Sequence, residues 1–164
     1  LNFANIKVAW LGEGNNVSHS WIEAAARFGF TLSLATPDQL QPDVNIIAKA
    51  QAEGGAITLT NDPADAIKDA DVVVTDTWLS MSNFGSASGQ KDIAAHKDML
   101  TPYRVTAMRM KEAAADAIFM HCLPVYRGNE ADAEVVDGAQ SVIWDEAENR
   151  LHVQKAIMCF CLNS

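Results

Sequence analysis

The sequence has few basic residues for its length, and this shortage excludes two classes of partner. Twelve lysines and arginines stand against 21 aspartates and glutamates among 164 residues, which gives a net charge of -9. Nucleic acids and anionic membranes are bound by basic surfaces, so we expect neither as a partner. The balance does not exclude a small anionic ligand, because helix N-termini and single arginines bind anions locally.

Cysteines and long apolar runs are also scarce. Cys122, Cys159 and Cys161 are an odd number without the spacing of a disulfide framework, which argues against a secreted disulfide-rich fold. No apolar stretch reaches about 18 residues, the length that crosses a bilayer. The first residues also lack a basic segment followed by an apolar one, so no secretory signal is expected. These shortages favour a cytoplasmic protein.

What the sequence does contain is a regular alternation of strand and helix patterns. Short apolar or β-branched runs predict strands, and apolar residues at helical spacing predict helices. The predicted strands are 6–11, 32–35, 57–60, 72–75, 118–121 and 142–144, and the predicted helices are 17–28, 44–52, 63–70, 91–99, 106–114 and 146–162. This order predicts one α/β domain over residues 1–164, a three-layer Rossmann-like fold with a mostly parallel sheet flanked by helices.

The last predicted helix carries more apolar surface than one stripe requires. Its apolar residues are Leu151, Val153, Ala156, Ile157, Phe160 and Cys161. Such a helix either covers a face of its own sheet or packs against something outside this chain. The pattern alone favours neither interpretation.

Polar segments follow four of the predicted strands. They are residues 12–16 (GEGNN), 76–81 (DTWLSM), 122–124 (CLP) and 145–150 (DEAENR). In open parallel sheets, ligands bind beyond the carboxyl ends of the strands. We therefore expect these four segments to converge on one edge of the sheet.

The first segment partly matches a dinucleotide-binding fingerprint. Gly12 and Gly14 fit the first two glycines of G-x-G-x-x-G, but Val17 stands at the third position and no acidic residue directly follows the second strand. The incomplete fingerprint disfavours a nicotinamide cofactor. Asn15 and Asn16 either cap the next helix or bind a ligand carboxylate.

Two further residues at strand ends have alternative interpretations. Asp76 either binds an ammonium group or caps a loop. Cys122, beside His121, is a thiolate, a hydrogen-bond partner, a metal ligand or an ordinary buried cysteine. No second His or Cys lies at metal-ligand spacing, so no structural zinc is expected. Neighbouring strand residues face opposite sides, so His121 is not expected to serve as a base for Cys122.

Arg150 follows the last predicted strand, near the start of the final helix. Its guanidinium group either forks onto phosphate or carboxylate oxygens or pairs with Glu146, one helical turn earlier. The spacing favours the two interpretations equally.

Taken together, the four segments resemble the second domain of the aspartate/ornithine carbamoyltransferase family. Residues 12–20 are similar to its G-x-G-N-N-x-x-H-S segment and residues 76–81 to its D-x-W-x-S-M-G loop. Residues 121–124 are its H-C-L-P motif, and residues 145–152 are similar to its E-A-E-N-R segment. The likeness covers nearly the whole chain in order and is strongest to the ornithine-specific members.

The resemblance implies a reaction and a set of site residues. Family members transfer a carbamoyl group from carbamoyl phosphate to an amine. The ornithine-specific members use the δ-amine of ornithine and give citrulline and phosphate, in arginine biosynthesis or the urea cycle, with no cofactor or metal. The implied residues are Asn16, Asp76, Ser80 and Met81 for ornithine, Cys122, Leu123 and Arg150 for carbamoyl phosphate, and Asp76 and Cys122 for catalysis.

The family's S-T-R-T-type phosphate-binding loop has no counterpart in this sequence. The resemblance therefore implies that the N-terminal carbamoyl phosphate-binding domain is absent from this chain and that the chain alone is inactive. It further implies a homotrimeric complete enzyme, with this piece alone a monomer. A non-catalytic amino-acid-binding module is an alternative.

The loop after Met81 departs from the family pattern. Ser82 stands where the family usually has glycine, and residues 83–90 make the loop longer than usual. In the family this loop closes over the amino acid. A different or acylated amine acceptor is therefore a further alternative.

Overall fold

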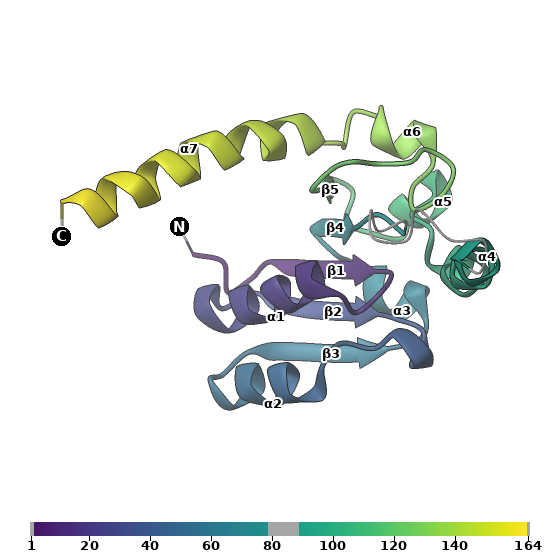
Figure 1. The fold of residues 1–164 in the computed structure, drawn as a ribbon, viewed down its shortest axis with the longest axis horizontal. Coiled ribbons are helices and arrows are strands. Elements are labelled where there is room, and N and C mark those ends of the chain that lie inside the picture. The colour runs from purple at the N-terminus through teal and green to yellow at the C-terminus, as the bar shows by residue number, and fades with distance from the viewer. Residues whose placement is uncertain (1, 79–88, 164) are drawn as a thin grey trace.

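A parallel sheet forms the centre of the chain. The computed structural model describes residues 2–78 and 89–163. Within them the sheet has five strands in the order β3-β2-β1-β4-β5, and every neighbouring pair is parallel (Figure 1). The strands are β1 (Lys7–Leu11), β2 (Thr31–Ala35), β3 (Ala56–Thr60), β4 (Val72–Thr75) and β5 (Ile118–His121).

Helices alternate with these strands and cover both faces of the sheet. They are α1 (Asn16–Phe28), α2 (Val44–Ala52), α3 (Pro63–Ile67), α4 (Gly89–Leu100), α5 (Ala107–Met110), α6 (Ala133–Val136) and α7 (Ile143–Leu162). Short 3-10 turns lie at Asp38–Leu40 and Thr101–Tyr103. The predicted α/β fold with a parallel sheet between two helical layers is confirmed.

The side chains of β1 show why the sheet is buried on both faces. Val8 and Trp10 belong to the apolar cluster that includes α1 and α2, whereas Ala9 and Leu11 belong to the cluster that includes α3, α5 and α6. Successive side chains of a strand point to opposite faces, so an uninterrupted apolar run fills both layers. None of these four residues exposes more than 3% of its surface.

The boundaries of α1 follow the capping signals in the sequence. Asn15 is the N-cap, and its side-chain oxygen accepts hydrogen bonds from the backbone N–H groups of Val17 and Ser18 at 2.9 and 3.1 Å. Gly29 ends the helix with φ at 79°, a left-handed conformation that glycine adopts without steric cost. The predicted helix-capping role of Asn15 is confirmed.

Three predicted elements are wrong in type or length. The helix predicted over 63–70 ends at Ile67, with Lys68 as its C-cap. Residues 142–144 are no sixth strand: Ser141 forms a single bridge with Phe119, and the chain enters α7 at Ile143. Three apolar residues fit either element, and the acidic stretch that follows favours a helix N-terminus.

The helix predicted over 106–114 stops at Met110, because the chain beyond it makes tertiary backbone bonds. Glu112 accepts from the N–H of Asp69, and the N–H of Ala114 donates to the carbonyl of Ala70.

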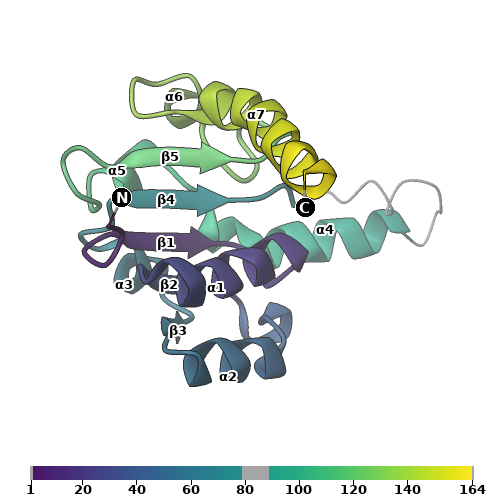
Figure 2. The same cartoon turned by 90° about the vertical axis from the view of Figure 1, so that its left-hand side faces the viewer.

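Helix α7 runs away from the rest of the chain after its first turn (Figures 1 and 2). Ile143 is fully buried in the core, but every residue from 151 to 163 is exposed. Phe160 exposes 76% of its surface and Ile157 56%. The interpretation in which this helix covers its own sheet is therefore wrong. None of the helices in residues 2–78 and 89–163 is both long and apolar enough to cross a bilayer.

Candidate functional site

The register of the sheet brings two of the predicted site residues together. Thr75 at the end of β4 pairs with His121 at the end of β5, so Asp76 and Cys122 are the next residues on two adjacent strands. In Figure 2 the arrowheads of β1, β4 and β5 point to the same edge of the sheet. The predicted convergence of the segments after β1, β4 and β5 on this edge is confirmed by contacts between their side chains.

Asp76 accepts three hydrogen bonds, which fix both oxygens of its carboxylate. Oδ2 accepts from the side-chain amide of Asn15 at 2.8 Å. Oδ1 accepts from the backbone N–H of Thr77 at 2.7 Å and from the thiol of Cys122 at 3.3 Å. The Asp76 side chain is half-buried, so it remains open to a ligand on one side. A fixed, partly exposed carboxylate suits an ammonium or amine group.

The environment of Cys122 keeps its side chain in the neutral thiol form. Burial, the negative charge of Asp76 and the hydrogen bond to Asp76 raise the pKa of Cys122 to about 12, and Glu146 adds to the effect. A thiolate is the reactive form of cysteine, so this residue is poorly suited to nucleophilic attack at neutral pH. Cys122 is exposed at the surface, so the interpretation as an ordinary buried cysteine is wrong, and the geometry favours the hydrogen-bond partner.

His121 faces the interior, opposite to Cys122, as the alternation along a strand predicts. It is fully buried, and its Nδ1 accepts a 2.9 Å hydrogen bond from the N–H of Leu123. Its Nε2 lies 3.5 Å from Oε1 of Glu130, which is also fully buried and accepts from the N–H of Tyr126 at 2.6 Å. His121 and Glu130 therefore fix the backbone of Leu123 and Tyr126, just beyond Cys122, from the interior of the protein. The Leu123–Pro124 peptide bond is cis.

Gly14 allows the loop after β1 to pack closely against the backbone of residues 40–42. A Cβ atom at this position would lie 2.1 Å from the backbone nitrogen of Pro42, and the N–H of Gly14 donates to the carbonyl of Leu40 at 2.7 Å. The backbone of residues 41–42 thus fills the space that a pyrophosphate would need beside this glycine. Together with Val17 at the third fingerprint position, this contact argues against dinucleotide binding.

The same edge carries an ion pair between the loop after β1 and α4. Nε2 of His96 lies 3.2 Å from Oε2 of Glu13, and both side chains are partly exposed. Trp10 donates from Nε1 to the backbone carbonyl of Glu13 at 3.1 Å, which fixes the loop from the side of the core. The loop after β1, the first of the segments that form the candidate site, is therefore attached both to β1 and to α4.

The other predicted site residues lie nearby with different degrees of contact. Asn16 is exposed at the first position of α1, and Leu123 packs partly against the core with φ at 60°. Arg150 is exposed on α7, and its side chain makes no hydrogen bond or ion pair within residues 2–78 and 89–163. Glu146 does not pair with it and instead accepts from the N–H of His121 at 2.9 Å. Ser80 and Met81 lie outside the described residues.

Burial raises the pKa of Glu146, and its hydrogen bond from the N–H of His121 opposes that rise. The first turn of α7 is attached to the end of β5 through this bond. Within the part of the chain that the structure describes, no three His, Cys, Asp or Glu residues form a group that could hold a metal ion.

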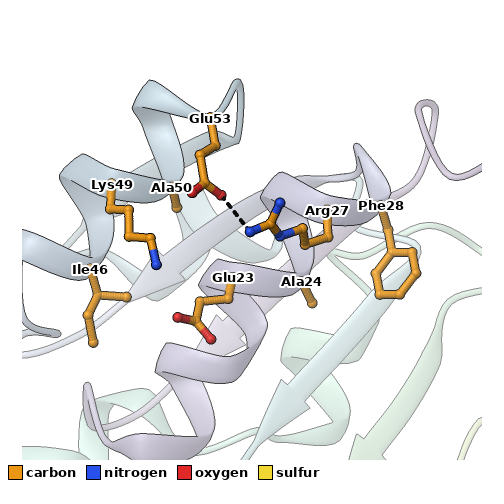
Figure 3. A pocket seen from close by; sticks show the side chains of 8 residues that line it. All are labelled: Glu23, Ala24, Arg27, Phe28, Ile46, Lys49, Ala50 and Glu53. Atoms are coloured by element: carbon orange, nitrogen blue, oxygen red, sulfur yellow. Dashed lines mark ion pairs between the residues drawn. The ribbon is translucent and has the colours of Figure 1, made fainter. Parts of the chain in front are cut away.

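A separate pocket of about 240 Å³ lies between α1 and α2 (Figure 3). Arg27 and Glu53 form a 3.4 Å ion pair across it, and Lys49 and Glu23 also line it. Arg27 and Glu53 stand at the C-terminal ends of the two helices, away from the edge that carries Asp76. This pocket is therefore not part of the candidate site.

Sequence reasoning missed the connections that organise the site. Asn15 was expected as a cap or a ligand-binding residue, but its bond to Asp76 has no local sequence signal because 61 residues separate the two. Glu130 was not singled out. From the sequence alone, an isolated acidic residue between turn residues is expected to be exposed. Only the fold shows that Glu130 is buried beside His121.

The fold and the site define a parallel α/β domain that presents polar side chains for a small metabolite at the carboxyl edge of its sheet. The family described as aspartate/ornithine carbamoyltransferase, Asp/Orn binding domain, matches residues 4–161. The chain belongs to this family. It is similar to the ornithine carbamoyltransferase of Rhizorhabdus wittichii, with 50% identity over 94% of this chain and 48% of the relative.

Solved structures give the same result. The ornithine carbamoyltransferase of Pyrococcus furiosus aligns with a TM-score of 0.85 and 40% identity over 96% of this chain and 50% of its own. The anabolic enzyme of Campylobacter jejuni aligns with a TM-score of 0.86 and 37% identity over 98% of this chain and 52% of its own. The chain thus spans about half the length of the relatives it matches.

Proposed function

We propose that this chain is the ornithine-binding half of an ornithine carbamoyltransferase. The observation that carries the proposal is the half-buried carboxylate of Asp76, fixed between Asn15 and Cys122 at the carboxyl edge of the sheet. The names of relatives with about half of their residues identical to this chain support ornithine as the amine substrate. The reaction transfers a carbamoyl group from carbamoyl phosphate to the δ-amine and gives citrulline and phosphate.

In this reaction Asp76 orients the attacking amine. The δ-amine of ornithine must be neutral to attack, and in that state it still has two N–H groups. One N–H donates to the exposed side of the Asp76 carboxylate, which aims the nitrogen lone pair at the carbonyl carbon. The N–C bond forms while the C–O bond to phosphate breaks, and the proton that the nitrogen loses ends on the departing phosphate.

Cys122 acts as a neutral hydrogen-bonding group beside the reacting carbonyl. Its S–H group donates to Asp76, so the sulfur lone pairs are left to accept from an N–H of either substrate. With its pKa raised to about 12, the thiol stays protonated at neutral pH and forms no covalent intermediate. Positioning and electrostatic stabilisation provide most of the acceleration.

The remaining contacts follow from the resemblance to the family. Asn16, Ser80 and Met81 complete the ornithine site together with Asp76. Leu123 and Arg150 join Cys122 at carbamoyl phosphate, and the exposed guanidinium of Arg150, without an ion pair in the described part of the chain, is available for a phosphate. The resemblance assigns the main phosphate site to the N-terminal carbamoyl phosphate-binding domain, and the chain spans about half the length of its relatives.

A chimera tests the proposal. The 164-residue chain replaces the matching half of the Rhizorhabdus wittichii relative, and citrulline formation from ornithine and carbamoyl phosphate is measured. We expect turnover above the background of the relative's other half alone. A folded chimera without citrulline formation, in millimolar ornithine, contradicts the proposal.

The same chimera separates the alternatives for the amine acceptor. Turnover with N-acetylornithine but not with ornithine identifies an acylated acceptor, which the departure at Ser82 made an alternative. Ornithine binding by calorimetry without any turnover identifies a non-catalytic amino-acid-binding module. Each result replaces the ornithine-specific proposal.

We further propose a homotrimeric, cytoplasmic enzyme of arginine metabolism without nucleic-acid or membrane partners. The family resemblance supports the trimer, and the net charge of -9 supports the lack of anionic partners. Analytical ultracentrifugation of the chimera, beside the 164-residue chain alone, tests the assembly. A monomeric, active chimera contradicts the trimer.

A further inference from the structure

We infer that Asn15 is the positioning residue for Asp76: its side-chain amide connects the N-terminus of α1 to the carboxylate and holds that carboxylate in the orientation that meets the amine. The inference rests on the proposed function for its effect on turnover. It extends that proposal, because the family resemblance gave the ornithine contact to Asn16 and no role in the reaction to Asn15.

The two ends of the Asn15 amide have different tasks. Oδ1 accepts from the backbone N–H groups of Val17 and Ser18 and so caps α1. Nδ2 donates to Oδ2 of Asp76 at 2.8 Å. The hydroxyl of Ser18, which is fully buried, donates to the backbone carbonyl of Asn15 at 2.8 Å and so fixes the backbone of Asn15. The amide is therefore held by the helix before it contacts Asp76.

The contact defines the plane of the Asp76 carboxylate. Rotation about the Cβ–Cγ bond of Asp76 moves both carboxylate oxygens together, and the N–H of Thr77 and the thiol of Cys122 oppose this rotation only through Oδ1. The Asn15 amide holds Oδ2 on the other side of the group and so adds the second restraint on the rotation. Oδ1 then stays within 3.3 Å of the Cys122 thiol, so the bond from Asn15 also maintains the contact between Asp76 and Cys122.

Two substitutions separate positioning from capping. Serine, aspartate and asparagine cap helices about equally well, so Asn15→Ser and Asn15→Asp retain the cap of α1 while they lose the N–H donor to Asp76. In Asn15→Asp a second carboxylate faces the first. We expect kcat/KM for ornithine in the chimera to fall about 30-fold for Asn15→Ser, as for the loss of a hydrogen bond to a charged group, and further for Asn15→Asp. KM for carbamoyl phosphate should change less than about twofold.

Asn45→Asp is the matched control. Asn45 also donates from its side-chain amide to an aspartate, the N-cap residue Asp43 at 3.0 Å, but it is exposed on α2. This variant should leave both kinetic constants unchanged. In the background of Asp76→Ala, Asn15→Ser should add less than about a twofold loss, because a residue that acts through Asp76 has no effect without it.

Alkylation of Cys122 by iodoacetamide provides a readout that needs no turnover. A carboxylate that rotates away from Cys122 loses its hydrogen bond with the thiol (3.3 Å in the structure) and suppresses thiolate formation less, although its charge remains. Asn15→Ser in the 164-residue chain should therefore raise the alkylation rate of Cys122 about fivefold or more at pH 8, by analogy with other hydrogen-bonded thiols, while Asn45→Asp leaves it unchanged.

These measurements separate failure of the inference from failure of the proposed function. If the unsubstituted chimera forms no citrulline, the proposed function fails, and the alkylation rates still decide whether Asn15 positions Asp76. The inference is overturned if Asn15→Ser leaves the Cys122 rate unchanged. It is equally overturned if the loss of kcat/KM in the double variant equals the product of the losses caused by Asn15→Ser and Asp76→Ala alone. A KM for carbamoyl phosphate that rises together with the KM for ornithine also overturns it.

Discussion

His121 and Glu130 face each other inside the protein, with Nε2 of the imidazole 3.5 Å from Oε1 of the carboxyl group and neither side chain exposed. His121 also accepts from the N–H of Leu123, and Glu130 accepts from the N–H of Tyr126. The two side chains thus replace water as partners for the backbone of the turn that carries Cys122. A buried backbone N–H that loses its acceptor destabilises the fold.

Glu130→Ala should lower the free energy of unfolding by about 3 kcal/mol, because it leaves the buried N–H of Tyr126 without its acceptor and removes the carboxyl group that lies 3.5 Å from the imidazole of His121. Glu130→Gln retains an acceptor oxygen and should cost about 1 kcal/mol. Urea unfolding followed by circular dichroism measures both. Glu134→Ala, at an exposed position on α6, is the control and should change stability by less than about 0.5 kcal/mol. Equal losses for the alanine and glutamine variants would count against the acceptor role.

Asp76→Ala should reduce citrulline formation by the chimera at least about 100-fold, because it removes the group that orients the amine. Stability should fall by only about 1 kcal/mol, since the half-buried side chain leaves its donors within reach of water. Steady-state kinetics and urea unfolding measure the two effects. Asp65→Ala, an exposed position on α3, should leave turnover unchanged. A variant that unfolds would make Asp76 a structural residue.

Asp76→Asn should make Cys122 more reactive. Asp76 raises the pKa of Cys122 both by its charge and by its hydrogen bond, so the neutral amide lowers that pKa from about 12 toward the ordinary value of 9.0. The thiolate fraction at any pH below this range then increases, and alkylation becomes faster. Peptide-resolved mass spectrometry between pH 7 and pH 10 follows the rate at Cys122, with Asp65→Asn as the control. An unchanged pH profile would exclude Asp76 as the cause of the raised pKa.

Gly14→Ala should destabilise the chain by about 3 kcal/mol, because the added methyl group meets the backbone of Pro42 at 2.1 Å. Gly29→Ala is the comparison variant: nothing lies within 4 Å of its Cβ position, but φ is 79°, so it should cost about 1 kcal/mol from backbone strain alone. Denaturant unfolding ranks the two variants. The reverse order would mean that residues 41–42 move aside without cost.

The amides of α7 from residue 151 to residue 162 should exchange with deuterium far faster than those of β1 and β4. These helical residues are all exposed, whereas β1 and β4 lie in the centre of the sheet. A helical segment of this length without packing is marginal in water. Hydrogen-exchange mass spectrometry of the 164-residue chain measures the difference. Protection equal to that of β1 would show that something covers the helix in solution.

The sequence predicted the elements whose patterns are local. The runs at β1, β4 and β5 and the caps at Asn15 and Gly29 depend on neighbouring residues, and the structure places them within one residue of the prediction. Residues 142–144 were mistaken for a strand because three consecutive apolar residues carry no periodicity. The end of α5 was misplaced because it depends on a backbone hydrogen bond from Asp69 to Glu112 and one from Ala114 to Ala70, and residues 69 and 70 belong to a distant segment.

The candidate site likewise contains features that the sequence predicted and features that it did not. Asp76 and Cys122 were predicted from strand ends and from the family motifs, and the sheet brings them together. The bond from Asn15 and the burial of Glu130 depend on which strands are neighbours, and a single sequence does not contain that order. Arg150 lies on the exposed helix α7, and its side chain forms no hydrogen bond or ion pair with Asp76 or Cys122, so its role stays a prediction.

The pairing of Thr75 with His121 fixes how far apart the backbones of Asp76 and Cys122 lie. Backbone hydrogen bonds of the sheet, and not the segment after Asp76, determine that separation. The segment can therefore change in length and composition without altering the spacing of Asp76 and Cys122. Under the proposed function, this arrangement separates selectivity for the amine from the transfer step.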